Sequence, residues 1–419
     1  MNILIIGGGG REHALAWAVS QNPKCDRVFA LPGNPGIAEL GTCLAGDPTD
    51  VDAVTEAAQA HRIDLAIVGP EAPLVAGIAD ALRAVGVPTL GPSREAAQLE
   101  ASKAFAKEIC AAAGVPTAPS FHARDVAEAH AHVAAQGAPI VVKADGLAAG
   151  KGVTVAQDLE SAHAAVEAIF AGMHGRAEAL IEAVLTGEEA SFFVLTDGET
   201  AVPLGSAQDH KRLGDGDVGP NTGGMGAYTP APVVTAEVAA AVMAEIVHPT
   251  LAELARRGMP YQGVLFVGLM IDDGAPSVVE FNVRLGDPET QALMLRLGAQ
   301  ALDLFHAAAT ASLAGRGPVW AEDHAMAVVL AAAGYPGSPR TGDLLEGLEP
   351  LAPRTEIFHA GTALRDGSLV SAGGRVLAAA ARGGSLSEAR DLAYTALDRI
   401  TLEGGQSRRD IGACVLGRR

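Results

Sequence analysis

Two lysines flank a loop of small residues in the run VVKADGLAAGKGV. Only six of the thirty basic residues in the chain are lysines, and the others are arginines. A compact ammonium on a flexible stem suits a point charge on a phosphate oxygen, whereas the arginine fork suits planar partners. Lys143 ends the apolar run PIVVK, and Lys151 lies between Gly150 and Gly152. This pattern predicts a lid over a nucleotide triphosphate. A solvated turn is the alternative, and the P-loop pattern GxxxxGK[ST] does not match.

The run SVVEFNVRLGDPETQ carries a second group of polar side chains. Because side chains alternate along a strand, Glu280, Asn282 and Arg284 are expected on one face and the apolar residues between them on the other. A carboxylate and an amide oxygen two residues apart suit Mg²⁺. Arg284 beside them could neutralise a transferring phosphoryl group. An exposed strand face with an incidental ion pair is the alternative.

Three further stretches offer contacts to a ligand. Residues 208–230 are polar and rich in glycine, which is typical of a functional loop rather than a connector. In IEAVLTGEEAS, Glu182 and Glu189 could contact a ribose or an adenine amine, or form an ordinary acidic turn. The N-terminal run IIGGGGREH follows an expected strand and opens an expected helix, so its amides could hold an anion. It fits no GxGxxG register, which argues against a dinucleotide site.

Composition limits the partners and the metal chemistry. The net charge of −19 argues against nucleic acid and membrane surfaces, because it leaves no broad basic patch. The cysteines are far apart and show no metal-ligand spacing, so they are expected to be ordinary thiols of a reducing cytosol. The histidines lack a ligand cluster and are predicted not to bind metal. These residues are Cys25, Cys43, Cys110 and Cys414, and His122, His130, His132, His163 and His174.

The elements that must position these residues begin with a parallel sheet. The apolar runs NILIIGG, RVFAL, LAIVG and VPTLG alternate with alanine-rich helical patterns, which predicts an open α/β sheet with ligand loops at the carboxyl ends of its strands. One helix is expected across SREAAQLEASKAFAKEICAAAG, ending at Gly114. A compact α+β unit follows, then the strands EASFFVLTDG, AVPLGSAQD, GVLFVGLMIDDG and SVVEFNVRLG. Short β segments and a final helix complete the chain.

These motifs together resemble the ATP-grasp ligases and, within them, the glycinamide ribonucleotide synthetase family. The resemblance spans the chain through IIGGGGREHALAW, GPEAPLVAGIAD, VVKADGLAAGKGV and GPNTGGMGAYTP, and RLGDPETQ is its most discriminating run. It implies an α/β ATP-grasp fold with an N-terminal Rossmann-like open parallel sheet, a small α+β ATP lid, a central ATP-grasp domain and a small C-terminal β-rich domain. Leu285 stands where the family commonly has phenylalanine.

The resemblance also implies a reaction and the residues that serve it. ATP would phosphorylate the carboxylate of glycine, and the amine of 5-phosphoribosylamine would attack the glycyl phosphate. The implied catalytic residues are Arg284, Lys143 and Asp209. The implied ATP contacts are Lys103, Lys143, Lys151, Gly150, Gly152, Glu182, Leu185 and Glu189. The implied metal ligands are Glu280 and Asn282. The implied substrate contacts are Gly8, Gly9, Gly10, Asn221, Thr222, Gly223, Gly224, Met225, Gly226 and Asp287.

Several expectations remain open alternatives. How the substrate contacts divide between glycine and phosphoribosylamine is undecided. The strand GVLFVGLMI is apolar, so any second metal ligand must come from elsewhere, with Asp287 and Glu289 as candidates. A different ATP-grasp carboxylate-amine ligase, a dinucleotide-dependent oxidoreductase and a non-catalytic nucleotide-binding protein are the rival functions.

Four domains are expected, together with a small set of partners. They are an N-terminal substrate domain at 1–101, a central ATP-grasp domain at 102–120 and 188–322, an ATP lid at 121–187 and a C-terminal domain at 323–419. The expected cofactors are ATP and Mg²⁺, for which Mn²⁺ may substitute. The expected partners are the small-molecule substrates alone, without nucleic acid or membrane, in a cytoplasmic monomer.

Overall fold

The N-terminal part of the chain forms the predicted open parallel sheet. The computed structural model describes residues 1–146, 152–173, 178–349 and 351–417. The five strands lie in the order β3-β2-β1-β4-β5, and their apolar runs are covered by helices, as parallel sheets require. The strands are β1 (Asn2–Gly7), β2 (Arg27–Pro32), β3 (Thr42–Cys43), β4 (Leu65–Val68) and β5 (Thr89–Leu90). The helices are α1 (Gly10–Ser20), α2 (Pro35–Leu40), α3 (Val51–Ala60), α4 (Glu71–Ala76) and α5 (Ile78–Ala84).

The single helix expected to end at Gly114 is instead two helices. They are α6 (Gln98–Ala101) and α7 (Lys103–Ala113). Ser102 between them is extended, with φ −132° and ψ 115°, and its hydroxyl accepts a hydrogen bond from the Phe105 amide, as an N-cap does. The apolar residues keep helical spacing on both sides of Ser102, so the sequence predicts one helix. The prediction was wrong because the Ser102 side chain caps the start of a second helix. The break makes Lys103 the first residue of α7.

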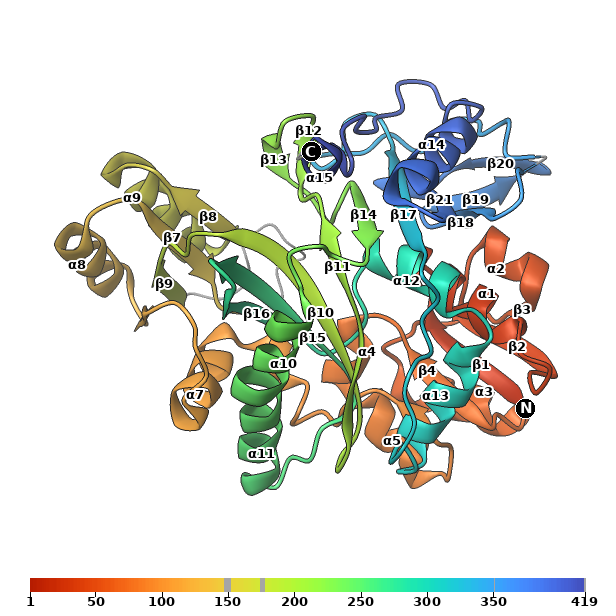
Figure 1. The fold of residues 1–419 in the computed structure, drawn as a ribbon, viewed down its shortest axis with the longest axis horizontal. Helices are drawn as coiled ribbons and strands as arrows, with labels where there is room; N and C mark the ends of the chain where they lie inside the picture. The colour runs from red at the N-terminus through yellow and green to blue at the C-terminus, as the bar shows by residue number, and fades with distance from the viewer. Residues whose placement is uncertain (147–151, 174–177, 350, 418–419) are drawn as a thin grey trace.

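A small antiparallel sheet with two helices follows. Its order is β6-β9-β7-β8, and Ala129, Val133, Ala162 and Val166 bury the helices against it. The strands are β6 (Ser120–Ala123), β7 (Ile140–Ala144), β8 (Val153–Ala156) and β9 (Ala179–Ala183). The helices are α8 (Val126–Gln136), α9 (Leu159–Ala168) and the wider turn η1 (Ile169–Met173). Figure 1 shows this unit at the left, away from the N-terminal sheet.

An eight-stranded sheet joins the middle and the C-terminal end of the chain. Its order is β16-β15-β10-β11-β14-β17-β21-β18. The strands are β10 (Glu188–Asp197), β11 (Ala201–Asp209), β14 (Gly226–Thr229), β15 (Gln262–Asp272), β16 (Ala275–Asn282), β17 (His324–Ala331), β18 (Thr355–His359) and β21 (Arg375–Gly383). The boundary predicted at residue 323 falls just before β17, inside the chain segment that completes this sheet. The fourfold domain division stays a prediction.

Helices α12 (Glu289–Leu297) and α13 (Gln300–Ala309) lie at the centre of the molecule. Their apolar residues share one core cluster with β1, α1 and β10. Figure 1 shows α12 between α1 and the strands β14 and β17. Helix α12 therefore holds the N-terminal sheet and the large sheet in a fixed relation. The chain ends with β19 (Thr362–Arg365), β20 (Ser368–Ser371), α14 (Leu386–Leu397) and α15 (Ala413–Leu416).

The long loop predicted at 208–230 is mostly paired backbone. Strand β11 runs into it, β12 (Arg212–Gly214) and β13 (Val218–Asn221) form a hairpin, and β14 closes it. The prediction of a long loop was wrong because the polar and glycine residues that suggested it form the turn of this hairpin. Gly216 and Asp217 there have φ of 71° and 55°, the left-handed region that turns need.

Within the described residues, one helical stretch is long and apolar enough to cross a membrane by length and composition alone. It spans Ala236–Arg256 and comprises α10 (Ala236–Ala241), η2 (Val242–Val247) and α11 (His248–Arg256). Val238, Ile246 and Leu254 are buried in the core cluster beneath β10 and β15. The stretch therefore packs one apolar face on the sheet, as a surface helix of a folded domain does.

Candidate active site

Two lysines from different elements meet one buried glutamate between α7 and the small sheet. The ammonium of Lys143 on β7 lies 2.6 Å from Glu182 Oε2, and that of Lys107 on α7 lies 2.9 Å from Glu182 Oε1. Lys143 also donates to the Val279 carbonyl at 3.1 Å. Both Lys143 and Glu182 are at most 5% exposed. Two ion pairs and one hydrogen bond therefore connect the small sheet to α7 and to β16.

Lys103 completes this group, which we call the nucleotide half: Lys103, Lys107, Lys143 and Glu182. Its ammonium donates to the Gly146 carbonyl at 2.8 Å, and its amide donates to Asp145 Oδ1 at 2.6 Å. Burial lowers the pKa of Lys103 and of Lys107. A cavity of about 570 Å³ opens between α7, β6 and β9, and Lys107 and Asp145 line it. The three ammonium groups provide a concentrated positive charge for an anionic ligand.

The end of β16 carries the predicted metal ligands. Glu280 lies 4.0 Å from the ammonium of Lys211, which also pairs with Glu189 on β10. Burial opposes ionisation of Glu280, but Lys211 and the lysines of the nucleotide half hold the pKa of its carboxyl below its ordinary value. Asn282, at 8% exposed, lies on the same strand. An ionised carboxylate and an amide oxygen are hard ligands of the kind that Mg²⁺ prefers.

Two further carboxyl groups beside Lys211 have raised pKa values. Burial and the charges of Glu289 and Glu189 outweigh the attraction of Lys211 and raise the pKa of Asp209 to about 8. Burial also raises the pKa of Glu289, whose Oε1 accepts a hydrogen bond from Ser191 at 3.1 Å. Asp209 can therefore gain or lose a proton near neutral pH.

Arg284 follows the end of β16, which ends at Asn282. Its guanidinium donates to Asn282 Oδ1 at 3.2 Å, so Arg284 lies beside Asn282 as predicted. The guanidinium also donates to Glu100 at 2.7 Å and to Glu71 at 3.1 Å. Arg284 therefore links the end of β16 to two carboxylates from the N-terminal part of the chain.

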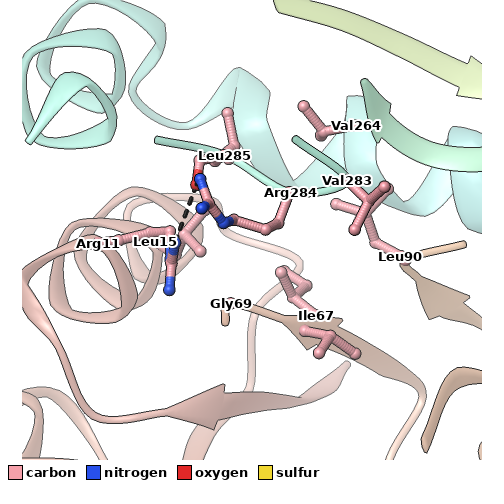
Figure 2. A pocket seen from close by; sticks show the side chains of 11 residues that line it. Arg11, Leu15, Ile67, Gly69, Leu90, Val264, Val283, Arg284 and Leu285 are labelled. Carbon is pink, nitrogen blue, oxygen red and sulfur yellow. Dashed lines mark hydrogen bonds between the residues drawn. The ribbon is translucent and has the colours of Figure 1, made fainter. Parts of the chain in front are cut away.

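Figure 2 shows Arg284 beside Arg11 at a small cavity whose other walls include Ile67, Leu90 and Val283. Its volume is about 10 Å³, which is room for roughly one water molecule. Arg11 donates to the Leu285 carbonyl at 3.0 Å. Leu285 itself is buried in the core cluster. The cavity is too small for a substrate.

A third group, which we call the acceptor half, comprises Gly9, Gly10, Thr222–Gly224, Asp287 and Arg375. Asp287 Oδ2 accepts the Arg11 amide at the start of α1 at 3.2 Å. Arg375 Nη1 donates to the Gly223 carbonyl at 2.5 Å and to the Asp287 carbonyl at 2.6 Å. Gly9 lies against Asp287, because a Cβ built on it would lie 3.6 Å from Oδ2. Three distant runs of sequence therefore meet at Asp287.

Other predicted substrate residues face away from this group. Met225 is fully buried and its amide donates to the His210 carbonyl. Gly226 lies against Ile411, and a Cβ on Gly8 would lie 2.4 Å from the Gly33 carbonyl oxygen. Asn221 pairs with Arg212 in the hairpin. These positions shape the backbone around the site.

The remaining predicted nucleotide residues are placed as follows. Leu185 lies after β9 and is half-buried, and Gly152 accepts a backbone hydrogen bond from Ala144 at 2.8 Å. Gly150 and Lys151 lie outside the described residues. Four residues that the sequence reasoning missed contact the site: Lys107, Glu71, Glu100 and Arg375. The spacing of Lys103 and Lys107, four residues apart on one helix, was a usable signal for the first.

The prediction that the histidines lack a ligand cluster is wrong for His122, and two others, His130 and His163, contact each other. His122 Nε2 lies 3.1 Å from Glu178 Oε2, and Asp145 is near enough to both for the three to be arranged like metal ligands. The Nδ1 atoms of His130 and His163 lie 2.6 Å apart. Strand pairing and the packing of α8 on α9 bring these residues together. Sequence spacing does not show such contacts.

Known proteins resemble this chain along its whole length. Residues 1–100, 101–290 and 325–414 match the N, ATP-grasp (A) and C domain models of phosphoribosylglycinamide synthetase. The chain is 52% identical over 414 residues to the phosphoribosylamine–glycine ligase of Rhizobium meliloti, with 98% of each chain covered.

Two solved structures share the fold. The phosphoribosylamine–glycine ligase of Thermotoga maritima is 32% identical, with a TM-score of 0.87 over 98% of this chain and 100% of that one. A biotin carboxylase of Campylobacter jejuni has a TM-score of 0.73 at 15% identity, over 97% and 92% of the two chains. At that identity the second match shows the shared fold alone.

Proposed function

The chain belongs to the phosphoribosylglycinamide synthetase family, and we propose how its own residues carry out the reaction of that family. It is an ATP-dependent ligase that joins glycine to 5-phosphoribosylamine, giving glycinamide ribonucleotide, ADP and phosphate in purine biosynthesis. The arrangement of Glu280, Asp209 and Lys211 between the nucleotide half and the acceptor half carries the proposal, because both substrates must meet the phosphoryl group there.

The nucleotide half would bind ATP. Lys103 and Lys143 are proposed to contact its phosphates, after Lys143 exchanges Glu182 for a phosphate oxygen. Glu182 and the backbone to Leu185 are proposed to line the adenine, and Glu189 to hold the ribose. The pairs Lys143–Glu182 and Lys211–Glu189 support this, since a lysine held by one carboxylate can turn to a more highly charged anion.

An ATP-grasp ligase uses ATP with a divalent metal, and we propose Mg²⁺, with Mn²⁺ able to substitute. Glu280 and Asn282 would hold it, and Glu289 is a better candidate for a further ligand than Asp287, which faces Arg11 and Arg375. The donor set fits, because it offers oxygen atoms alone and Glu280 is held ionised. When bound, the metal would offset phosphate charge during phosphoryl transfer.

The proposed reaction has two steps, and a side chain of the protein is assigned to each. Glycine carboxylate attacks the terminal phosphorus of ATP to give glycyl phosphate and ADP, and Arg284 is proposed to stabilise the charge on the acyl phosphate. The amine of phosphoribosylamine then attacks the glycyl carbonyl carbon and phosphate leaves. Asp209 is proposed to take the proton that the amine loses, which its pKa of about 8 suits.

Phosphate release tests the function directly. Purified protein with ATP and Mg²⁺ should release phosphate only when glycine and freshly generated phosphoribosylamine are both present, with glycinamide ribonucleotide formed in equal amount. Release without glycine would overturn the substrate assignment. We further propose a cytoplasmic monomer whose partners are these small molecules, which the net charge of −19 supports. Light scattering across a concentration series tests the monomer.

A further inference from the structure

Arg375 is the first residue of β21, and among the described residues its guanidinium makes hydrogen bonds through Nη1 alone. Nη1 donates to the carbonyls of Gly223 and Asp287 and lies 3.4 Å from Asp287 Oδ1. Over the described residues, Nε and Nη2 have no hydrogen-bond partner, and the side chain is 23% exposed. The guanidinium is therefore fixed in place while two of its nitrogen atoms remain available for a bidentate contact with two oxygen atoms of a phosphate or a carboxylate.

Glycine at position 223 keeps that free edge uncovered. A Cβ built on Gly223 would lie 3.1 Å from Arg375 Cζ and 3.3 Å from Nη2. Any larger residue would have to displace the guanidinium or cover it. The neighbouring Gly224 has φ of 110°, which an L side chain rarely adopts, so this turn is restricted to glycine by its backbone.

Gln291 on α12 provides an independent sign of a missing ligand. Its side chain is 1% exposed, and Oε1 has no hydrogen-bond partner among the described residues. Nε2 donates to Asp287 Oδ1 at 2.8 Å, which fixes the orientation of the amide. A buried carbonyl oxygen without a donor is costly. Gln291 Oε1 can therefore accept a hydrogen bond from a hydroxyl or an amine next to Asp287.

The same place receives the positive end of a helix. Gln291 Nε2 would lie 2.5 Å from a Cβ on Gly10, the first residue of α1, so the amide touches the glycine loop. The Arg11 amide in that first turn already donates to Asp287 Oδ2. Helix α1 is 11 residues long, and the positive end of its dipole favours an anion near its N-terminus. Helix α1, α12 and β21 thus contribute to one site.

These contacts call for a ligand that combines a phosphate with hydroxyl donors. We propose that Arg375 binds the 5-phosphate of phosphoribosylamine and that Gln291 Oε1 accepts a hydrogen bond from a ribose hydroxyl. Asp287 and Gly223 hold Arg375 in position. The inference rests on the proposed function and deepens it: the acceptor half holds the ribose phosphate, which leaves glycine to the region of Arg284.

Arg375→Lys tests the phosphate contact, because it keeps the charge and loses the planar fork. The KM for phosphoribosylamine should rise roughly 10- to 100-fold, as expected for the loss of a hydrogen bond between charged groups. The KM values for ATP and glycine should stay within about twofold. Gln291→Met should raise the same KM about 10-fold, since it loses the acceptor and keeps the volume.

Arg382→Lys is the matched control. Arg382 lies on the same strand, bonds to the Leu295 carbonyl and pairs with Asp323, away from Asp287. All three of its KM values should be unchanged. An Arg375→Lys enzyme with a raised KM for glycine would place the glycine carboxylate here instead. A uniform fall in kcat with unchanged KM values would make Arg375 purely structural. Either result overturns the proposal.

Calorimetry with ribose 5-phosphate separates this inference from the proposed reaction. The wild-type protein should bind ribose 5-phosphate, and Arg375→Lys should weaken that binding roughly 10-fold or more. Free ribose should bind both proteins equally weakly. Wild-type binding that Arg375→Lys leaves unchanged would overturn the inference even if the ligase reaction is observed. Binding that depends on Arg375 would support it even if the ligase reaction is absent.

Discussion

The nucleotide half and the acceptor half hold their positive charges in different ways. In the nucleotide half, Lys107 and Lys143 are paired with the carboxylate of Glu182. In the acceptor half, Arg375 is held mainly by backbone carbonyl oxygens, with one nearby carboxylate at 3.4 Å. We propose that the first arrangement exchanges partners when a stronger anion enters, and that the second keeps its partners and adds a ligand on the free edge.

The difference follows from the two side chains. A lysine ammonium can leave one carboxylate for a phosphate with a small movement of a flexible stem, while the arginine fork binds on two edges at once. The small sheet that carries Lys143 contacts α7 beside an open cavity of about 570 Å³. Arg375 begins β21, which is paired on both sides, with β17 and β18, in the large sheet. We therefore expect closure around ATP and a largely preformed site for the ribose phosphate.

The largest effect is expected where the two halves meet. Glu280→Gln removes a carboxylate that would bind metal, so kcat should fall about 10³-fold, because a metal contributes several kcal/mol to such a transition state. The KM for phosphoribosylamine should change little, since Glu280 lies outside the acceptor half. Steady-state kinetics at saturating Mg²⁺ measures both.

Asp273→Asn provides the control for Glu280→Gln. Asp273 is exposed in the turn after β15, with φ of 47°, which asparagine tolerates. It should leave kcat unchanged. A Glu280→Gln enzyme that retains more than about a tenth of its activity would contradict a metal site on β16.

A smaller effect distinguishes two lysines of the nucleotide half. Lys143→Met should lower kcat/KM for ATP about 10²-fold and Lys107→Met about 10-fold, in the range expected for charged hydrogen bonds. Lys143 bonds directly to β16 at the Val279 carbonyl, whereas Lys107 reaches that strand only through Thr117, whose hydroxyl donates to the Val278 carbonyl. Equal losses would mean that both lysines act by positioning Glu182.

The sequence carried enough information for the architecture and for the local motifs. Periodicity indicated the parallel sheet, and the strand IVVKA carries Lys143 as predicted. It could not reveal the break at Ser102, because a serine inside a helical pattern is compatible with continuation as well as with capping. It also missed the hairpin within 208–230, where pairing between backbones overrides polar composition.

The contacts of the candidate site were less accessible to sequence reasoning. Arg284 contacts Asn282 as the alternation predicted, but its ion pairs with Glu71 and Glu100 join segments that are distant in the sequence. Arg375 lies far along the chain from Asp287, in a run of small and apolar residues that indicates a buried strand. Its role depends on the strand order that places β21 beside β17. Local patterns carry no information on such a neighbour.

The smallest expected effect concerns pH and arises from two buried histidines, His13 and His359, next to the glycine loop of the acceptor half. His13 follows the glycine loop, and its Nδ1 accepts the amide of His359 on β18 at 2.8 Å. Burial and the neighbouring His359 lower the pKa of His13 from 6.5 to about 3, and burial lowers that of His359 to about 4. The four residues of the nucleotide half include no histidine, so this pH dependence does not come from them.

The sign of this pH effect follows from proton binding. Below pH 6.5 the two histidines bind protons in the unfolded chain but stay neutral in the folded chain. The free energy of unfolding should therefore fall by about 1.4 kcal/mol per pH unit for each histidine. The loss should continue until pH approaches the folded pKa values of about 3 and about 4. At pH 5 it amounts to about 2 kcal/mol for His13.

His13→Gln should remove that part of the pH dependence, because glutamine keeps an acceptor for the His359 amide and does not titrate. Urea unfolding at pH 7.5 and pH 5.0 measures the difference, with exposed His248→Gln as the control that keeps the wild-type slope. If His13→Gln loses as much stability as the wild type between these pH values, His13 does not stay neutral in the folded protein. The hydrogen bond that joins the glycine loop to β18 would then tolerate a charged imidazole, and the acceptor half would rest on charge as the nucleotide half does.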